Sequence, residues 1–223
     1  MNPLTQVVVA TIAFVGTHFL MSHRLRAPMV ARLGERGFQG VYSLVSLTIF
    51  AWLIWAMFQV GPEPMLWTAP HWAWLVGGAV MLVASVLLVG SLIGNPALPG
   101  MSVSEREPRG VFAITRHPMM WSFALWAAVH AAIWPQPSVL VLCAGIALLA
   151  LAGAAGQDGK KSRLQPDFWP VWRAKTAFVP FTGPALKRSW WPGWGVLLGS
   201  LALWLLATWL HPVFGAPSVG VWS

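Results

Sequence analysis

Long apolar runs separated by short polar segments dominate the pattern along the chain. An α-helix needs roughly 20 residues to cross ~30 Å of hydrocarbon, and six runs come close to that length. They cover residues 3–21, 41–60, 71–93, 118–134, 137–156 and 194–214. The fourth run is short, and Pro135-Gln136-Pro137 joins it to the fifth, which is typical of a tight turn between antiparallel helices. The pattern predicts an all-α, polytopic integral membrane helical bundle with about six transmembrane helices, forming one domain over residues 1–223.

The basic residues fall in alternate loops between these runs. All 14 Lys and Arg residues lie in three segments, 22–40, 94–117 and 157–193. The remaining loops and both ends of the chain have none. Loops rich in Lys and Arg stay on the cytoplasmic side of a membrane. We therefore expect a protein of the bacterial inner membrane with both termini in the periplasm.

Composition excludes several other classes of protein. Charged residues make up 9% of the chain, against roughly 25% in an ordinary soluble domain, so a soluble or disordered chain is excluded. The net charge of +8 would point to nucleic acid in a soluble protein, but here the cytoplasmic loops account for it. We expect the lipid bilayer, and no nucleic acid, as a partner. The single cysteine, Cys143, excludes a disulfide framework and a cysteine-based zinc site.

Histidines are the main chemical feature of so apolar a chain. Polar side chains inside a bilayer are costly, so each one is a functional hypothesis by default. His18 lies about one turn inside the first run, and His130 lies in the fourth run among small residues that leave room for a flat cofactor. Two intramembrane histidines on different helices can hold a b-type haem, whereas each can also be structural. No CxxCH motif is present, which excludes covalent haem attachment.

The sequence Arg116-His117-Pro118 is a second chemical feature. Proline is favoured at the first turn of a helix, so His117 is expected near a helix N-terminus. Arg116 beside it can pair with a carboxylate or a phosphate. Arg116 and His117 are therefore candidate catalytic residues, and the alternative is a helix start with a snorkelling arginine. The sequence contains no Walker A motif and no HExxH motif.

An ordered set of motifs resembles the NnrU family of bacterial membrane proteins and its relative, the plant and cyanobacterial zeta-carotene isomerase. The motifs are Gly16-Thr17-His18, Arg24-Leu25-Arg26, residues 33–43, Gly94-Asn95-Pro96, Thr115-Arg116-His117-Pro118-Met119, and Leu125-Trp126 with His130. The resemblance implies a multi-spanning fold, haem b as cofactor, and a redox or isomerase reaction on a lipophilic small molecule. For the NnrU branch it implies a setting in nitrate and nitrite respiration (denitrification), with no assigned reaction. A respiratory reductase is a further expected partner.

The resemblance also implies which residues hold the cofactor. Carried over residue by residue, the ligand candidates for the haem iron are His18 and His130, with His117 in the Arg-His-Pro motif. His71 is a further cofactor-binding candidate, from its expected depth in the membrane. Arg116 and His117, in the Arg-His-Pro motif, would be catalytic residues.

Two features of this chain differ from what the resemblance implies. The isomerase has a cysteine three residues before the match of His130, where this chain has Ala127. His18 and His130 differ in expected depth by ~12 Å at 1.5 Å per residue. The pair His18 and His117, or the pair His71 and His130, suits an upright haem better.

Two alternatives stay open at this point. Arg-His-Pro followed by a basic loop also resembles integral-membrane methyltransferases of the isoprenylcysteine type. Arg116 and His117 would then hold S-adenosylmethionine, and Asp158, Lys161 and Arg173 would shape the acceptor site. The other alternative is a non-catalytic assembly or transport factor for a respiratory reductase, with structural histidines.

Overall fold

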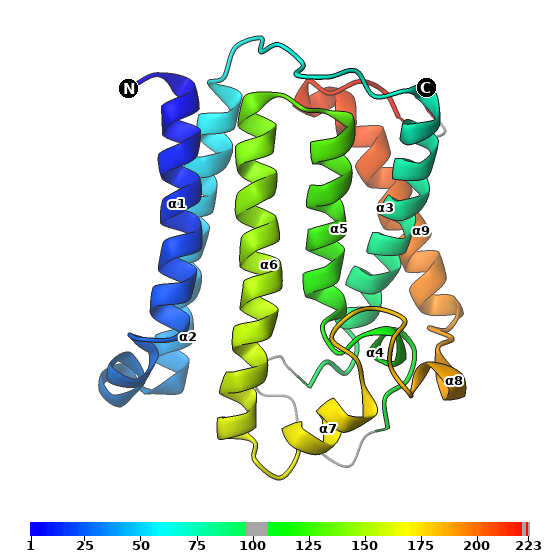
Figure 1. Ribbon diagram of the computed structural model, residues 1–223. Coiled ribbons are helices and arrows are strands. Elements are labelled where there is room, and N and C mark those ends of the chain that lie inside the picture. Colours follow the sequence, from blue (N-terminus) through cyan, green and yellow to red (C-terminus); the bar gives the residue numbers. More distant parts are fainter. Residues whose placement is uncertain (97–106, 220–221, 223) are drawn as a thin grey trace. The chain divides into compact units, whose positions relative to one another are not determined.

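The computed structural model describes residues 1–96, 107–219 and 222 as helices joined by turns and loops (Figure 1). Among these residues there is no β-strand, which confirms the all-α prediction. The helices are α1 (Pro3–Ser22), α2 (Arg26–Phe58), α3 (His71–Ser91), α4 (Val111–Ile114), α5 (Pro118–Ile133), α6 (Pro137–Leu164), α7 (Trp169–Lys175), α8 (Leu186–Ser189), α9 (Trp194–Leu210) and the 3₁₀ helix η1 (His211–Phe214).

The predicted apolar runs coincide with the long helices. Five described helices, namely α1, α2, α3, α6 and α9 with η1, are long and apolar enough to cross a membrane, and α5 is a shorter apolar helix. Their outward faces stay apolar, since large side chains such as Leu44, Leu47 and Leu198 are 66%, 67% and 63% exposed. A surface of this kind requires hydrocarbon around it. The chain is therefore a polytopic helical membrane protein.

Two helix boundaries differ from the prediction. Residues 26–40 were expected in a loop, but they form the first turns of α2, interrupted where Gly34 adopts φ +70°. Residues 157–164 were also expected in a loop, but they extend α6. Gln, Lys and Arg are good helix formers, so the helix continues past the end of the apolar run. Lys161 and Arg163 also stabilise the negative end of its dipole.

The chain folds into two compact units. Unit 1 contains residues 1–68 and 130–149. In it α1 and α2 form an antiparallel pair, with Val7 and Ala10 of α1 buried against Leu53 and Ala56 of α2. Val141 and Leu142, near the start of α6, pack on the same cluster.

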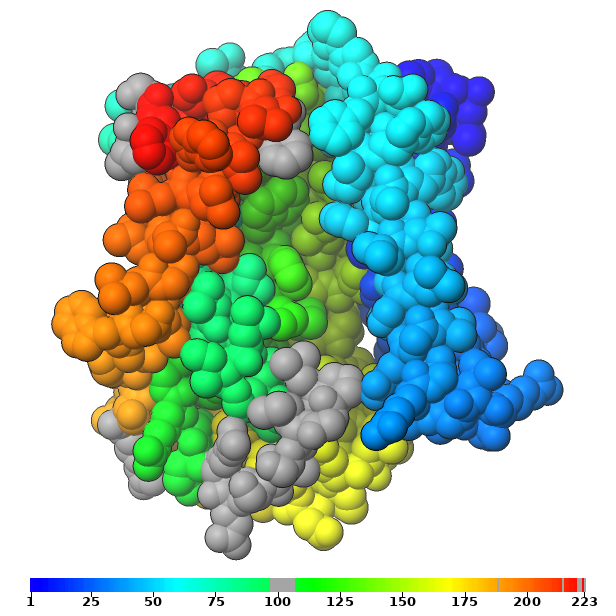
Figure 2. All heavy atoms as spheres, turned by 180° about the vertical axis from the view of Figure 1, so that it is seen from behind, coloured from blue at the N-terminus to red at the C-terminus, as the bar shows by residue number. Residues whose placement is uncertain are grey.

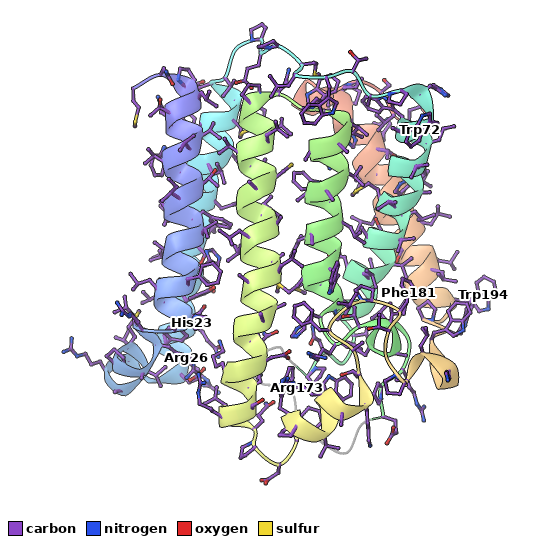
Figure 3. The ribbon with its side chains drawn as sticks, viewed as in Figure 1. His23, Arg26, Trp72, Arg173, Phe181 and Trp194 are labelled. Carbon is purple, nitrogen blue, oxygen red and sulfur yellow. The ribbon has the colours of Figure 1, made fainter. Side chains whose placement is uncertain are left out.

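Unit 2 contains residues 69–129 and 150–223. Helices α3 and α9 pack along each other, and the indole Nε1 of Trp204 donates to the Gly78 carbonyl over 3.1 Å. Figure 2 shows α9, in orange, at the surface of this unit. Figure 3 places Trp72 at the start of α3 and Trp194 at the start of α9, at opposite ends of the pair. Indoles at both ends of apolar helices are typical of anchoring at the two membrane–water interfaces.

A second cluster closes one end of unit 2. Leu87, Val111, Phe112 and Ile114 are buried together with Trp169 and Trp172 of α7. This cluster packs the short helices α4 and α7 against the end of α3. Trp121 and Leu125 of α5 pack against the same cluster.

Candidate functional site

The start of α5 is fixed by hydrogen bonds to the segment after α7. Thr115 is extended, and its hydroxyl donates to the Phe178 carbonyl over 2.7 Å. The backbone N–H of Arg116 donates to the Ala177 carbonyl over 2.8 Å. Trp121, one turn into α5, donates from Nε1 to the Phe178 carbonyl over 2.8 Å. The Arg-His-Pro motif therefore lies in a buried and well-defined backbone.

Asp158, on the last turns of α6, joins three elements of unit 2. The Arg116 guanidinium binds its carboxylate in a forked arrangement, with Nε at 2.9 Å and Nη2 at 2.6 Å from Oδ2. The other oxygen, Oδ1, lies 3.0 Å from His117 Nε2 and accepts a hydrogen bond from Trp169 Nε1 over 3.2 Å. We call Arg116, His117, Asp158 and Trp169 the Asp158 cluster.

The positive charge of Arg116 and the negative charge of Asp158 are paired in the protein interior. Arg116 is 8% exposed and Asp158 is 7% exposed. A buried carboxylate needs a positive partner and hydrogen bonds to its remaining lone pairs, and Arg116, His117 and Trp169 supply both. Such an arrangement holds the site rigid, because removal of one member leaves another charge unpaired.

His117 is the member of the cluster with a ring nitrogen that is available to bind a ligand or a proton. Its side chain is fully buried, its Nε2 faces Asp158, and its Nδ1 has no hydrogen-bond partner among the described residues. Phe178 lies edge-on with the two ring centroids 5.4 Å apart. We assign the Nε2–H tautomer, because the carboxylate is an acceptor only. The lone pair of the imidazole is then at Nδ1.

A small cavity lies beside His117. Its volume is about 30 Å³, and Asn95, Arg116, His117, Met120 and Gln157 are among its lining residues. A space of this size holds about one water molecule or the end of a larger molecule. An imidazole with one nitrogen on a carboxylate and the other without a hydrogen-bond partner, in a residue that lines a cavity, is suited to accept a proton or to bind one ligand atom.

His18, a predicted haem ligand, lies in unit 1. Its Nδ1 lies 2.7 Å from the Phe14 carbonyl one turn earlier in α1, which leaves Nε2 as the nitrogen with the lone pair. Its ring packs against Phe14 and edge-on against Tyr42 of α2. A histidine that donates one N–H to a backbone carbonyl is oriented as metal-binding histidines are.

The predicted pair His18 and His130 is not brought together in unit 1. His130 is in the last turn of α5, shortly before a loop that leads into α6, and the start of α6 packs against Val7. His18 lies about 16 Å further along α1 than Val7, at 1.5 Å per residue. The two histidines therefore lie toward opposite ends of unit 1. His71, the first residue of α3, is exposed.

Two further predictions concern a metal ion and S-adenosylmethionine. Among the described residues there is no group of three or more His, Cys, Asp or Glu side chains placed to hold a metal ion. Arg116 and His117, expected to hold S-adenosylmethionine in the methyltransferase alternative, both bind Asp158, and the cavity beside them is far smaller than the roughly 300 Å³ of an ordinary ligand site. No observation favours that alternative.

The ionic partners of Asp158 and the place of Trp169 in this cluster were not predicted from the sequence. The one available signal was an acidic residue, Asp158, directly after an apolar run, since such a residue requires a partner when its helix continues. Its partners lie 41 and 42 positions earlier in the chain and 11 positions later, which no local pattern reveals.

Together, the apolar helices and the Asp158 cluster define a polytopic membrane protein with a buried histidine–carboxylate site. A family model described as "NnrU protein" matches residues 6–218. The chain therefore belongs to the NnrU family, as the sequence motifs predicted. Comparison with curated proteins and with solved structures gave no match.

Proposed function

We propose that this member of the NnrU family is a haem-b-binding membrane protein that acts on a lipophilic small molecule by a redox or isomerase reaction, with His117 as its proton-transferring residue. The observation that carries the proposal is the geometry of His117. Its Nε2 faces Asp158, its Nδ1 is buried and unpartnered among the described residues, and the residue lines a small cavity.

His117 performs the proton transfer in this proposal. Nδ1 accepts a proton from one atom of the substrate, and the resulting imidazolium is stabilised by the Asp158 carboxylate at 3.0 Å. The double bond next to that atom is weakened and rotates, and the same proton then returns to the same atom, so the cis bond becomes trans without an external oxidant. The cavity admits only a water-sized group, so only the reacting end of the substrate enters it.

Arg116 is a positioning residue in this proposal, because its contacts with the Asp158 carboxylate are charge-assisted hydrogen bonds that hold the guanidinium on that group. It holds the carboxylate in the orientation that fixes the His117 ring. Trp169 has the same role from α7, through its indole N–H.

His18 is the residue that we propose would hold haem b. Its contact with the Phe14 carbonyl orients the ring and leaves Nε2 for the iron. When bound, the haem would supply one-electron chemistry. His130 does not fit as the second ligand of the same haem, because it lies toward the other end of unit 1.

Absorption spectra of the detergent-purified protein, as isolated and after dithionite, test the haem part of the proposal. We expect a Soret band that sharpens on reduction, is lost in His18→Ala, and is retained in His130→Ala. A Soret band retained in His18→Ala contradicts the role of His18. Protein from haem-supplied cells that shows no Soret band contradicts haem binding altogether.

Expression in cells that accumulate a poly-cis carotenoid tests the isomerase part. We expect the trans isomer by chromatography, and a loss of about 10²-fold or more in His117→Gln, since general acid–base groups contribute that much. His23→Gln is the matched control, because His23 is an exposed histidine at the end of α1. No isomerisation by the unaltered protein, or equal activity of the two variants, contradicts the proposal.

The link to nitrate and nitrite respiration, with a respiratory reductase as partner, is part of the same proposal and rests on the family alone. Co-purification of a reductase with the tagged protein from denitrifying cells would support it. Unchanged growth on nitrate after deletion of the gene would contradict it.

A further inference from the structure

A second cavity, of about 500 Å³, lies within unit 2 and shares no lining residue with the cavity beside His117. This volume is in the range of small-molecule sites, roughly 300–1,000 Å³. The lining comes from the end of α3, from α4 and the turn before it, from α7 and from the start of α9.

The wall of this cavity is mostly apolar. Ile93, Val111, Phe112 and Val196 line it, and they come from three different segments of unit 2. Val111 and Phe112 also belong to the buried cluster around Trp172, so this wall is held by the core of the unit. The wall is suited to a hydrocarbon chain or another apolar body.

Trp172 places an unused hydrogen-bond donor at the same cavity. The residue lines the cavity and is 3% exposed, and its Nε1 has no hydrogen-bond partner among the described residues. An indole N–H can only donate. A buried donor without a partner is unfavourable, so a ligand oxygen that accepts from it relieves that cost.

Arg109 gives the cavity a positive charge. Among the described residues that line it, two are charged, Glu107 and Arg109. Glu107 is neutralised by Lys175, with Nζ 2.6 Å from its Oε1. Arg109 is exposed and has no ion pair with a described residue. The charge that remains for a ligand is therefore the guanidinium of Arg109, a group that binds carboxylate and phosphate oxygens in a forked arrangement.

We propose that this cavity binds an anionic amphiphile, a lipid-like molecule with a phosphate or carboxylate head and an apolar chain. The head accepts hydrogen bonds from Arg109 and from Trp172 Nε1, and the chain lies along Ile93, Val111 and Val196. Trp191, which also lines the cavity, and Trp194 lie at this end of α9, where interfacial indoles place the head-group level of a membrane. The inference is independent of haem binding and of the role of His117.

Native mass spectrometry of the detergent-purified full chain tests this site, with oleoyl lysophosphatidate as the probe. We expect one molecule bound per chain. We expect binding to weaken at least tenfold in Arg109→Gln and to recover in Arg109→Lys, and to weaken severalfold in Trp172→Phe, which keeps a ring in the core but lacks the N–H.

Matched controls separate the site from general effects of charge and shape. Arg173→Gln removes an exposed arginine from α7, which Figure 3 labels and which does not line the cavity, so it should bind normally. Ile93→Trp should fill the cavity and abolish binding, whereas Leu92→Trp, at a similarly exposed position outside the lining, should not.

Two further probes distinguish the parts of the ligand. Oleyl alcohol has the chain without the anion, and glycerol phosphate has the anion without the chain. We expect both to bind at least tenfold more weakly than oleoyl lysophosphatidate. Equal binding of either probe, binding unaffected by Ile93→Trp, or equal affinity of Arg109→Gln and Arg173→Gln would overturn the proposal.

Discussion

Asp158 is the residue on which the candidate site depends. Its two oxygens accept hydrogen bonds from Arg116, His117 and Trp169, which come from α7 and from the start of α5. The same contacts that orient the His117 ring therefore also join three helices of unit 2. Function and stability are coupled at this position, and a stability measurement on an Asp158 variant reports on the site directly.

Substitution of Asp158 by Asn should be strongly destabilising. The variant leaves the Arg116 guanidinium buried without an anion, which costs about 3–5 kcal/mol when a buried ion pair loses one partner. We expect that loss in the free energy of unfolding, measured by denaturant titration in detergent. Asp167→Asn is the matched control, because Asp167 is exposed, and it should change stability by less than about 0.5 kcal/mol. Equal stability of both variants would show that the Asp158 cluster is not formed.

At the scale of elements, close helix packing in unit 1 depends on Gly145. A Cβ built at Gly145 of α6 overlaps the Thr11 Cγ2 methyl of α1, whereas a Cβ at Gly153 of the same helix meets nothing within 4 Å. Small residues at such positions let two helices approach closely in a membrane. The α1–α6 contact therefore requires glycine at position 145, because the methyl group of an alanine would overlap Thr11.

Gly145→Ala should destabilise the protein by about 1–3 kcal/mol, the usual cost of overpacking a core. Thr11→Ser removes the opposing methyl group, so the double variant Gly145→Ala/Thr11→Ser should recover most of the loss. Gly153→Ala is the control and should be neutral or stabilising by up to about 1 kcal/mol, because alanine is the better helix former. Thermal unfolding in detergent measures all the variants beside the unaltered protein. A Gly145→Ala protein as stable as Gly153→Ala would contradict this packing.

The elements themselves were largely predictable from the sequence. The six apolar runs coincide with helices, because length and hydrophobicity alone determine which segments can cross hydrocarbon. The polar extensions of α2 and α6 were not predictable in the same way. The polarity of their Arg, Glu, Gln and Lys residues is typical of a loop, whereas the helix propensity of the same residues favours a helix. Tertiary contacts such as Arg116–Asp158 determine which of the two forms.

Only part of the candidate site could be predicted from the sequence, because some of its residues come together only through tertiary contacts. Arg116 and His117 adjoin a proline at a helix start, and that local pattern identifies them. Asp158 and Trp169 join them only through folding, and the Nδ1 of His117 becomes distinctive only when its surroundings are known. Haem ligation by His18 and His130 was implied by resemblance, and in unit 1 these two side chains lie toward opposite ends.

At the scale of the whole molecule, the charges predict how the chain lies in the membrane. All 14 Lys and Arg residues lie in three alternate segments between the apolar runs. The loop between α2 and α3 has none and should face the periplasm. The segments that carry the Asp158 cluster and the 500 Å³ cavity should face the cytoplasm, so both proposed sites receive their ligands from that side or from the inner leaflet.

Cysteine labelling tests this orientation. In a Cys143→Ser background, Gly61→Cys should react with a membrane-impermeant maleimide on intact spheroplasts, because the loop around Gly61 should be periplasmic. Asp167→Cys, also at an exposed position, should react only after the membrane is broken. Labelling in the opposite order would reverse the predicted topology.

The proposed proton transfer depends on which nitrogen of the His117 ring carries the proton. Nitrogen NMR of the protein labelled with ¹⁵N-histidine, in lipid, distinguishes the two ring nitrogens, and the His117→Gln variant assigns the signals by their loss. The account predicts a neutral ring with the proton on Nε2, toward Asp158, and an unprotonated Nδ1. A ring with the proton on Nδ1 would contradict the proposal, because the lone pair would then lie on Nε2, against the Asp158 carboxylate, and Nδ1 could not accept a proton.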